Sequence, residues 1–400
     1  MGRSLQVEVY RTPKEIEGLR PAWNELLDHC ATATIFSTWE WLFPWWQAFG
    51  EGRKLVVLAF FDSSKRLVAL APMSLATLRV AGVLNLRLLR LLGDGSGDSD
   101  NLDMPVRRGF ESDFASSFLN YLDRRDIEWN LCELNTLPSD SAAGKEILNR
   151  MRETGWTPVT HHQPCSTIRL PDRWESYLEQ ISKKEKDKLR YYSRRIEKRY
   201  RARFYKCTQE SEISPCLDAL FDLHRKRWQQ RGEAGVFATP ARRQFYEQMS
   251  RNFLARNWLE FWLLDLDGKT VAAQFAFRHR DRVFALQEGF DPAFSGESVG
   301  FVLRGHALKQ CIADGVAYYD FLAGKSESKE RWAVDVLSYT NLHFARPFGR
   351  GDAYLRLVNG AAAGKEWFRA HAPPAVWAGL HWLNLKRRRS QDTPSKSATD

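Results

Sequence analysis

The stretch RVFALQEGFDPAFSGESVGFVLRGHALKQCIADGVAYYDFLAG, residues 282–324, decides the fold of this 400-residue chain. Its pattern predicts four elements in order: a strand at 282–289, a loop at 290–299, a helix at 300–313 and a strand at 317–322. Gly315 follows the helix as a C-cap. Such a helix directs unpaired main-chain N–H groups and a partial positive charge at the preceding loop. The stretch therefore indicates an anion-binding turn between two strands.

The loop itself carries the residue types that a phosphate site needs. Gly296 and Gly300 would let a phosphate approach the main chain, and Ser298 offers a hydroxyl group. The N–H groups of Val299 and Gly300 begin the helix. Glu297 is unfavourable beside a phosphate, and an ordinary strand-to-helix turn with a serine cap is the alternative interpretation.

Outward from this stretch, the chain reads as two halves with the same element order. In the second half, strands at 258–266 and 270–278 are joined by Asp267-Gly268, a strong hairpin signal. The first half repeats the order of helices, hairpin, third strand, helix and strand. We therefore expect an α/β protein with two mixed sheets flanked by helices. The expected divisions are a first lobe at 1–172, a second lobe at 173–348, a helical extension at 349–385 and a disordered basic tail at 386–400.

Three segments lead to further expectations. The aromatic segment 36–49 is more typical of a core than of a sugar platform. The loop 93–100 is rich in Gly, Ser and Asp. Its aspartates would repel a phosphate, so we expect a loop in solvent and not a phosphate-binding loop. Residues 175–201 predict one long helix with an apolar stripe.

Composition limits where the protein works. The chain is 44% hydrophobic but has no run of about 20 apolar residues and no secretory h-region, which predicts a cytoplasmic protein. The six cysteines form no C-x-x-C pair and are interpreted as small buried side chains. No spacing of His residues indicates a metal.

Most of the net positive charge lies in one segment. Of a net charge of +10, residues 183–206 carry +9, from twelve Lys and Arg and three acids. An anionic partner and a solvated helix with one packed face both explain this run. The partner could be an anionic substrate or a membrane surface, which would place the protein at the periphery of the inner membrane. Nucleic acid is disfavoured, since no nucleic-acid fold signature accompanies the helix. The segment 377–389 has two open interpretations, a membrane-surface helix or packing followed by a disordered end.

Several motifs occur together over residues 174–334. They are the basic helix at 183–201, Asp267-Gly268 leading to Ala272-Ala273-Gln274, Gly289-Phe290-Asp291-Pro292, SGESVGFVLRGHAL from Ser295, Tyr319-Asp320-Phe321-Leu322-Ala323-Gly324 and Ser328-Lys329-Glu330-Arg331-Trp332. Together they resemble the GNAT superfamily, in particular the CelD/BcsL-like acyltransferase family, which is related to the FemAB-type transferases. The resemblance implies a tandem GNAT-like fold with acyl-CoA, either acetyl-CoA or a longer acyl-CoA, bound at the loop in the second half, and no metal.

The implied reaction is attack of an amine on a thioester, which needs a positioned donor and a route for the amine proton. Asp320 and Glu288 are the candidate catalytic carboxylates. The alternative interpretations are a structural hydrogen bond for Asp320 and a position on an exposed face for Glu288. Gln274, Lys329 and Trp332 are candidate substrate-binding residues. The alternative interpretations are a structural amide for Gln274, a solvated side chain for Lys329 and core packing for Trp332.

Three functions follow from the resemblance. The first is an N-acyltransferase acting on an amino sugar or similar polar amine in exopolysaccharide or cell-envelope metabolism. The second is a FemAB-like transferase that uses aminoacyl-tRNA, which the basic helix favours. The third is a non-catalytic accessory protein of polysaccharide assembly.

Overall fold

The structure is a computed structural model, and it describes residues 3–124, 126–229, 237 and 239–371. The first-half strands are β1 (Gln6–Tyr10), β2 (Lys54–Phe61), β3 (Leu67–Val80), β4 (Leu84–Leu91), β5 (Leu131–Pro138) and β6 (Val159–Arg169). The first-half helices are α1 (Pro13–Glu17), α2 (Arg20–Asp28), η1 (Ile35–Ser37), α3 (Trp39–Phe49), α4 (Glu111–Asp123) and α5 (Ala142–Thr154).

The second half repeats this order. Its strands are β7 (Ala202–Lys206), β8 (Leu259–Leu266), β9 (Lys269–His279), β10 (Arg282–Phe290), β11 (Tyr318–Ala323) and β12 (Asp335–Phe344). Its helices are α6 (Trp174–Gln180), α7 (Lys183–Arg199), α8 (Glu210–Gln229), α9 (Pro240–Ala255), η3 (Pro292–Glu297), α10 (Val299–Ala313), α11 (Glu327–Glu330) and α12 (Arg350–His371). The predicted α/β class and its repeated halves are confirmed. The predicted tail at 386–400 and the segment 377–389 lie outside the described residues.

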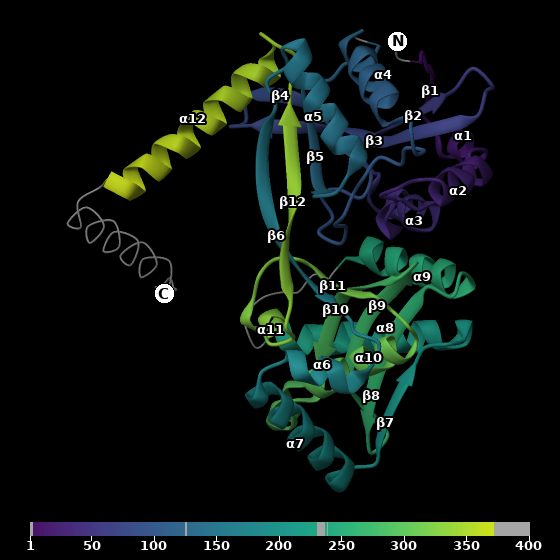
Figure 1. The fold of residues 1–400 in the computed structure, drawn as a ribbon, viewed down its shortest axis with the longest axis vertical. Helices are drawn as coiled ribbons and strands as arrows, with labels where there is room; N and C mark the ends of the chain where they lie inside the picture. Colours follow the sequence, from purple (N-terminus) through teal and green to yellow (C-terminus); the bar gives the residue numbers. More distant parts are fainter. Residues whose placement is uncertain (1–2, 125, 230–236, 238, 372–400) are drawn as a thin grey trace, which may run out of the picture.

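The strands of both halves join in one twelve-stranded mixed sheet, where the sequence predicted two sheets. The order is β1-β2-β3-β4-β5-β12-β6-β11-β10-β9-β8-β7, so each half receives its last strand from the other. Strand β12 of the second half pairs with β5, and β6 of the first half pairs with β11. Figure 1 shows β6 and β12 side by side as the two strands that run between the halves.

Local chemistry accounts for the element boundaries around the second-half sheet. Asp267 and Gly268 both adopt positive φ, as a two-residue hairpin turn of type I′ requires. The prediction of a single helix at 175–201 is wrong, because α6 ends at Gln180 and α7 begins after Ser182. The Ser182 hydroxyl accepts the N–H of Glu185 and so caps the start of α7.

One apolar core extends across both halves. Trp41 of α3 packs edge-on against Phe245 of α9, with ring centroids 5.2 Å apart. Phe36 packs against Phe284 of β10, 5.5 Å away. The expectation that segment 36–49 belongs to the core is confirmed. This packing fixes how the two halves face each other.

Membrane-spanning helices, metal-ligand clusters and disulfides would each indicate a special environment for the described part of the chain. No helix there is long and apolar enough to span a bilayer. No three or more His, Cys, Asp or Glu side chains come together there as a metal site. All six cysteines are buried and free, which confirms their interpretation as small buried side chains.

Helix α12 projects away from the sheet (Figure 1), and its first turn lies close to the main chain just before β5. A Cβ atom at Gly351 would lie 1.8 Å from the main-chain oxygen of Asn130. Gly351→Ala should therefore push α12 away from the end of β5 and destabilise the fold by about 1–3 kcal/mol, as overpacking does. Urea unfolding measures the change. Gly360→Ala, at a helical glycine whose added Cβ meets nothing within 4 Å, is the matched control and should not destabilise.

Candidate functional site

The sheet opens where β10 and β11 diverge. These parallel strands pair only over Arg282–Phe284 and Tyr318–Asp320. Beyond Asp320, β11 continues against β6, while β10 follows β9 to Phe290. The opening lies within the stretch that the sequence singled out. Main-chain groups at this point can therefore face a ligand instead of a neighbouring strand.

A β-bulge decides which way Glu288 points. The register of β10 against β9 shifts between Ala285 and Gln287. Val283, before the bulge, faces α10, and without the bulge Glu288 would face the other side of the sheet. With the bulge, Glu288 faces α10, and Gly289 lies against α8 on the opposite side. An added Cβ at Gly289 would come 2.8 Å from the Cβ of Leu223.

A cavity of about 270 Å³, here called the α10 cavity, lies at the start of α10. Its lining residues are Lys188, Arg227, Glu288, Phe290, Ser295, Ser298, Val299, Gly300, Phe301, Arg304, Ser328, Arg331 and Trp332. Five sequence-predicted residues meet here: Glu288, Ser298, Val299, Gly300 and Trp332. The predicted Gly296 is exposed and does not line the cavity.

The start of α10 is suited to an anion. Ser298 stands at the N-cap with a left-handed φ of 50°, and its side chain makes no capping hydrogen bond. The first turn of α10 contains no acidic residue. The corresponding helix of the first half, α4, differs, because Glu111 in its first turn accepts the N–H of Gly109. The first-half helix therefore presents carboxylates where the second-half helix presents open N–H groups.

The unfavourable Glu297 is neutralised by the basic helix. Its carboxylate accepts hydrogen bonds from Arg195 Nε at 2.7 Å and from Arg199 Nη1 at 2.8 Å. The hydrogen bonds from Arg195 are the main cause that lowers the Glu297 pKa. Glu297 is buried and does not line the α10 cavity. Its charge is thus compensated by α7 and does not oppose an anion at Gly300.

Cations surround the α10 cavity. Lys188, Arg227, Arg304 and Arg331 line it against one carboxylate, Glu288. Arg304, which the sequence did not single out, binds Glu288 through two nitrogens, with Nε 2.8 Å from Oε1. The wall also offers a buried donor: Trp332 is 1% exposed, and its Nε1 has no hydrogen-bond acceptor among the described residues. An anion that also accepts a hydrogen bond fits this lining.

Two of the three remaining predicted residues, Gln274 and Lys329, lie behind or beside this cavity. Gln274 is buried on β9 opposite Glu288, and its amide nitrogen donates to the Tyr319 hydroxyl group. Lys329 Nζ donates to three main-chain oxygens, those of Leu322, Ala323 and Gly324, at 2.6–3.3 Å. Burial lowers the Lys329 pKa. Lys329 holds the turn after β11 in this structure and would have to leave these oxygens to bind a phosphate.

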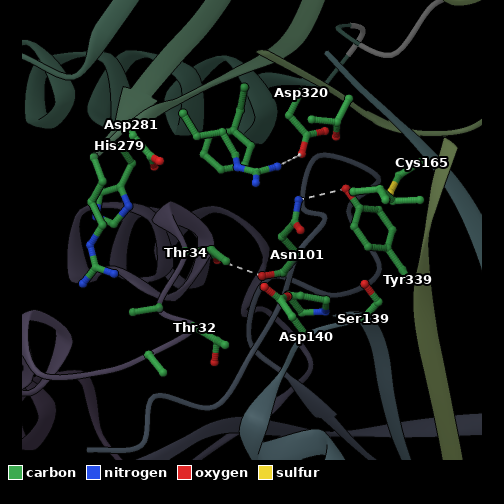
Figure 2. Close-up of a pocket in the computed structure, with 18 of the residues that line it drawn as sticks. Thr32, Thr34, Asn101, Ser139, Asp140, Cys165, His279, Asp281, Asp320 and Tyr339 are labelled. Carbon is green, nitrogen blue, oxygen red and sulfur yellow. Dashed lines mark hydrogen bonds and ion pairs between the residues drawn. The ribbon is translucent and has the colours of Figure 1, made fainter. Parts of the chain in front are cut away.

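A second cavity, of about 350 Å³ and here called the junction cavity, lies between the two halves. Both halves line it, through Ala31, Thr32, Ala33, Thr34, Asn101, Pro138, Ser139, Asp140, Cys165, Thr167, His279, Arg280, Asp281, Arg282, Phe284, Asp320, Leu337, Ser338 and Tyr339. Figure 2 shows Asn101 between Thr34 and Tyr339. Its amide donates to the Tyr339 hydroxyl and its main-chain oxygen accepts from Thr34, both at 2.8 Å.

Asp320 is the predicted residue that reaches the junction cavity. Its neighbour Tyr319 faces α10, so Asp320 faces the other side of the sheet. Asp320 accepts hydrogen bonds from Arg282 at 3.1 Å and from the N–H of Leu322 at 2.7 Å. Burial raises its pKa, against the lowering effect of Arg282. A carboxylate with this environment can take up a proton.

The expectation that loop 93–100 lies in solvent is wrong. Asp98 is buried, accepts the Tyr246 hydroxyl at 2.9 Å and lies 3.1 Å from Arg242. Asp100 accepts the N–H of Ala323, and burial raises its pKa to about 6. The loop thus carries carboxylates from the first half onto the second half. The closely spaced aspartates were the available signal, but the partners of Asp98 and Asp100 lie more than 140 residues away.

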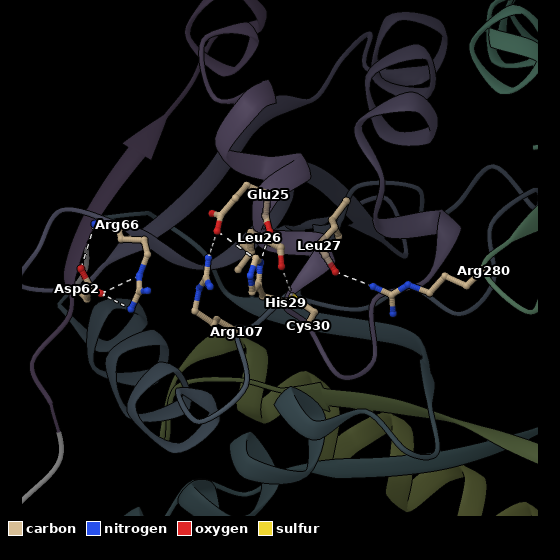
Figure 3. A network of polar contacts seen from close by, with 9 residues as sticks. All are labelled: Glu25, Leu26, Leu27, His29, Cys30, Asp62, Arg66, Arg107 and Arg280. Atoms are coloured by element: carbon tan, nitrogen blue, oxygen red, sulfur yellow. Dashed lines mark hydrogen bonds and ion pairs between the residues drawn. The ribbon is translucent and has the colours of Figure 1, made fainter. Parts of the chain in front are cut away.

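Arg280 joins the wall of the junction cavity to the first half (Figure 3). Its guanidinium donates to the main-chain oxygen of Leu27 at 2.7 Å, near the C-terminal end of α2. Cations are favoured at that end of a helix. Arg107 and Glu25 form an ion pair nearby. The Arg280 hydrogen bond holds the β9–β10 turn against α2 and so shapes one side of the cavity.

The buried Asp103 gives stability a pH dependence. Burial raises its pKa to about 7, although Ser141, Met104 and Thr32 donate hydrogen bonds to it. Between about pH 4 and 7 the folded state therefore holds a proton that the unfolded state has released. The free energy of unfolding should fall as pH rises through this window, by a few kcal/mol from this residue.

Asp103→Asn should flatten that slope, because the side chain no longer titrates. Urea unfolding at pH 4.5, 5.5 and 7 measures it. Asp123→Asn removes an exposed carboxylate at the end of α4, away from Asp103, and should leave the slope as it is. An unchanged slope in Asp103→Asn would contradict the assignment.

Comparisons with known proteins agree with this geometry. Residues 183–330 match the family model of the acetyltransferase (GNAT) domain. The fold is similar to that of FemX, with a TM-score of 0.57 and 10% identity over 88% of this chain and 99% of that chain. It is also similar to that of a conserved protein of unknown function from Bacteroides thetaiotaomicron VPI-5482, with a TM-score of 0.52 and 12% identity over 82% of this chain and 97% of that chain. No curated protein matches the chain in sequence. Residues 183–330 are thus similar to a GNAT acetyltransferase domain, within a chain that shares the fold of FemX.

Proposed function

We propose that this protein is an N-acyltransferase that moves an acyl group from acyl-CoA to the nitrogen of a polar amine. The observation that carries the proposal is the α10 cavity. It combines an uncapped helix N-terminus, four cationic side chains and an orphaned buried donor at Trp332. These features favour a ligand with phosphate groups. The match of residues 183–330 to a GNAT domain supports an acyl thioester as that ligand.

The donor would lie with its pyrophosphate at the N–H groups of Val299 and Gly300. Lys188 and Arg331 would face its charges, and Trp332 Nε1 would donate to an acceptor on it. The pantetheine arm of the donor, which carries the thioester, would extend from there toward the opening between β10 and β11. A main-chain N–H of β10 beyond Phe284 is the natural donor to the thioester oxygen, because the parallel ladder has ended there.

The acceptor would approach from the junction cavity. Three carboxylates line it, Asp140, Asp281 and Asp320, against two guanidinium groups, and Asp320 is paired with Arg282. Hydroxyl and amide groups of the cavity, among them Ser139 and Asn101, would hold the hydroxyl groups of an amino sugar. Excess carboxylate favours a protonated amine. The two cavities lie on opposite faces of the sheet and carry opposite charge.

The reaction needs one proton acceptor. The amine nitrogen attacks the thioester carbon, so that a C–N bond forms and the C–S bond breaks. One of the two protons that the protonated amine gives up ends on the sulfur of coenzyme A, which leaves as the thiol, and the other must be removed before the attack. Asp320 would take up that proton, because its carboxylate faces the acceptor cavity at the end of the ladder. Glu288, bound by Arg304, would orient the donor side.

A second candidate is aminoacyl transfer from tRNA, as the relationship to FemAB-type transferases implies. The basic helix α7, which adjoins the α10 cavity through Lys188, favours it. The resemblance to CelD/BcsL-like proteins supports an acceptor in exopolysaccharide or cell-envelope metabolism for the first candidate.

Amine-dependent thiol release tests the proposal. Acetyl-CoA and longer acyl-CoAs are mixed with the protein and a panel of amino sugars, and free thiol and product mass are measured. One N-acyl product per thiol is expected for at least one amine. No thiol release with any pair would overturn the acyl-CoA proposal, and consumption of aminoacyl-tRNA in its place would favour the second candidate.

A further inference from the structure

The outward surface of α7 carries more charge than the α10 cavity uses. Helical geometry places Lys183, Arg190, Arg194 and Lys198 in one row on the exposed side. None of these four side chains forms an ion pair with a described residue. We call this row the α7 stripe. It extends over about 22 Å at 1.5 Å per residue.

The α7 stripe is continuous with the α10 cavity. Arg195 shares a surface groove with Arg190 and Arg194 of the stripe and binds Glu297. Lys188, on the same side of the helix as Arg195, lines the α10 cavity with Nζ 4.9 Å from the Phe301 ring. The buried side of the helix, with Leu189 and Ile196, packs toward α10. A ligand whose reactive end enters the cavity therefore has its other end beside the stripe. Figure 1 shows α7 at the outer end of the second half, clear of the first half.

We infer that the α7 stripe docks an acidic carrier protein, which presents the acyl group on a phosphopantetheine arm. This inference rests on the proposed function, because it names the carrier of the same thioester. The phosphate that joins the arm to the carrier would sit at Val299 and Gly300. The carrier surface would then lie directly over α7, with its carboxylates facing the cations.

The composition of the stripe favours a protein over other polyanions. Asp187 lies within it, and a carboxylate in the middle of a cationic row repels a nucleic-acid backbone but can pair with a basic side chain of a protein. Tyr191, at 56% exposure, is the large apolar side chain that α7 exposes, so the helix has little to insert into a bilayer. The length of the stripe also exceeds what the phosphates of a single nucleotide can contact.

Charge reversal tests the inference. Arg190→Glu with Arg194→Glu is compared with Arg79→Glu with Arg152→Glu, which changes charge equally at exposed first-half positions that form no ion pair with described residues. Each variant is assayed with the same acyl group on coenzyme A and on a purified acidic acyl carrier protein. The α7 variant should raise KM for the acyl carrier protein by about tenfold or more and change kcat/KM for acyl-CoA less than about threefold. The control should change neither.

Other outcomes overturn the inference in recognisable ways. If acyl-CoA is used but the acyl carrier protein is not, the carrier is wrong while the proposed function stands. Equal losses of kcat/KM with both donors would assign the stripe to a group that the two donors share or to the amine, and a loss confined to acyl-CoA would assign it to coenzyme A. Copurifying RNA that binds the wild type but not the α7 variant would assign it to RNA, and selective binding of anionic phosphatidylglycerol vesicles would assign it to a membrane. If neither thioester is consumed, the proposed function fails first.

Discussion

Gly300→Glu should weaken binding of acetyl-CoA by at least about 100-fold, close to 2.7 kcal/mol. Gly300 lines the α10 cavity at the first turn of α10, and a Cβ there would meet only the Phe290 side chain, at 3.5 Å. The fold should therefore tolerate the change. The new carboxylate, however, would occupy the place of a phosphate and repel it. Isothermal titration calorimetry with acetyl-CoA and a longer acyl-CoA measures the loss.

Gly296→Glu is the matched control. It adds the same charge four residues earlier, at an exposed glycine whose added Cβ meets nothing within 4 Å and which does not line the cavity. Binding should weaken no more than several-fold. Equal losses in the two variants would mean a general charge effect, and unchanged binding in Gly300→Glu would move the donor away from α10.

Asp320→Asn should reduce kcat by about 10²–10⁴, the range for losing a general base. Asparagine keeps an oxygen for the N–H of Leu322 but cannot take up the amine proton. Since burial raises the Asp320 pKa, wild-type activity should fall as pH decreases through that raised value. The variant should lose this acidic limb. Steady-state rates between pH 5 and 9 measure both effects.

Two comparisons separate catalysis from structure. Asp281→Asn changes an exposed carboxylate of the same cavity and should alter KM for the amine more than kcat. Glu288→Gln should disturb donor binding, because it breaks the pair with Arg304. If Glu288→Gln loses kcat and its pH limb while Asp320→Asn keeps both, Glu288 is the base.

Much of the site was predictable because it lies in one continuous stretch. The loop and helix within 282–324 bring Ser298, Val299 and Gly300 to one cavity through short-range geometry, whereas Glu288 joins them only because of the bulge in β10. Trp332 follows soon after and closes the same cavity. Arg304 was missed, although it stands on the same helix, because an arginine there has no distinctive spacing before its partner Glu288 is placed.

The residues that sequence patterns could not assign have partners far along the chain. Glu297 was a reason to doubt a phosphate site until Arg195 and Arg199 were seen to bind it. Lys329 was a candidate substrate-binding residue, and its position against three main-chain oxygens depends on the turn after β11. Asp100 belonged to a loop expected in solvent, and its burial depends on Ala323 of the other half.

By itself the sequence determined most of the element order, the repeated halves, the hairpin at Asp267-Gly268 and the loop-to-helix turn before α10. Those features follow from periodicity, turn chemistry and helix ends, which act over a few residues. Only the tertiary structure decided that β6 and β12 change places, that a bulge turns Glu288 toward α10, and that Asp320 faces a cavity between the halves. Strand pairing and the burial of carboxylates depend on contacts between residues that are distant in sequence, and no local pattern records them.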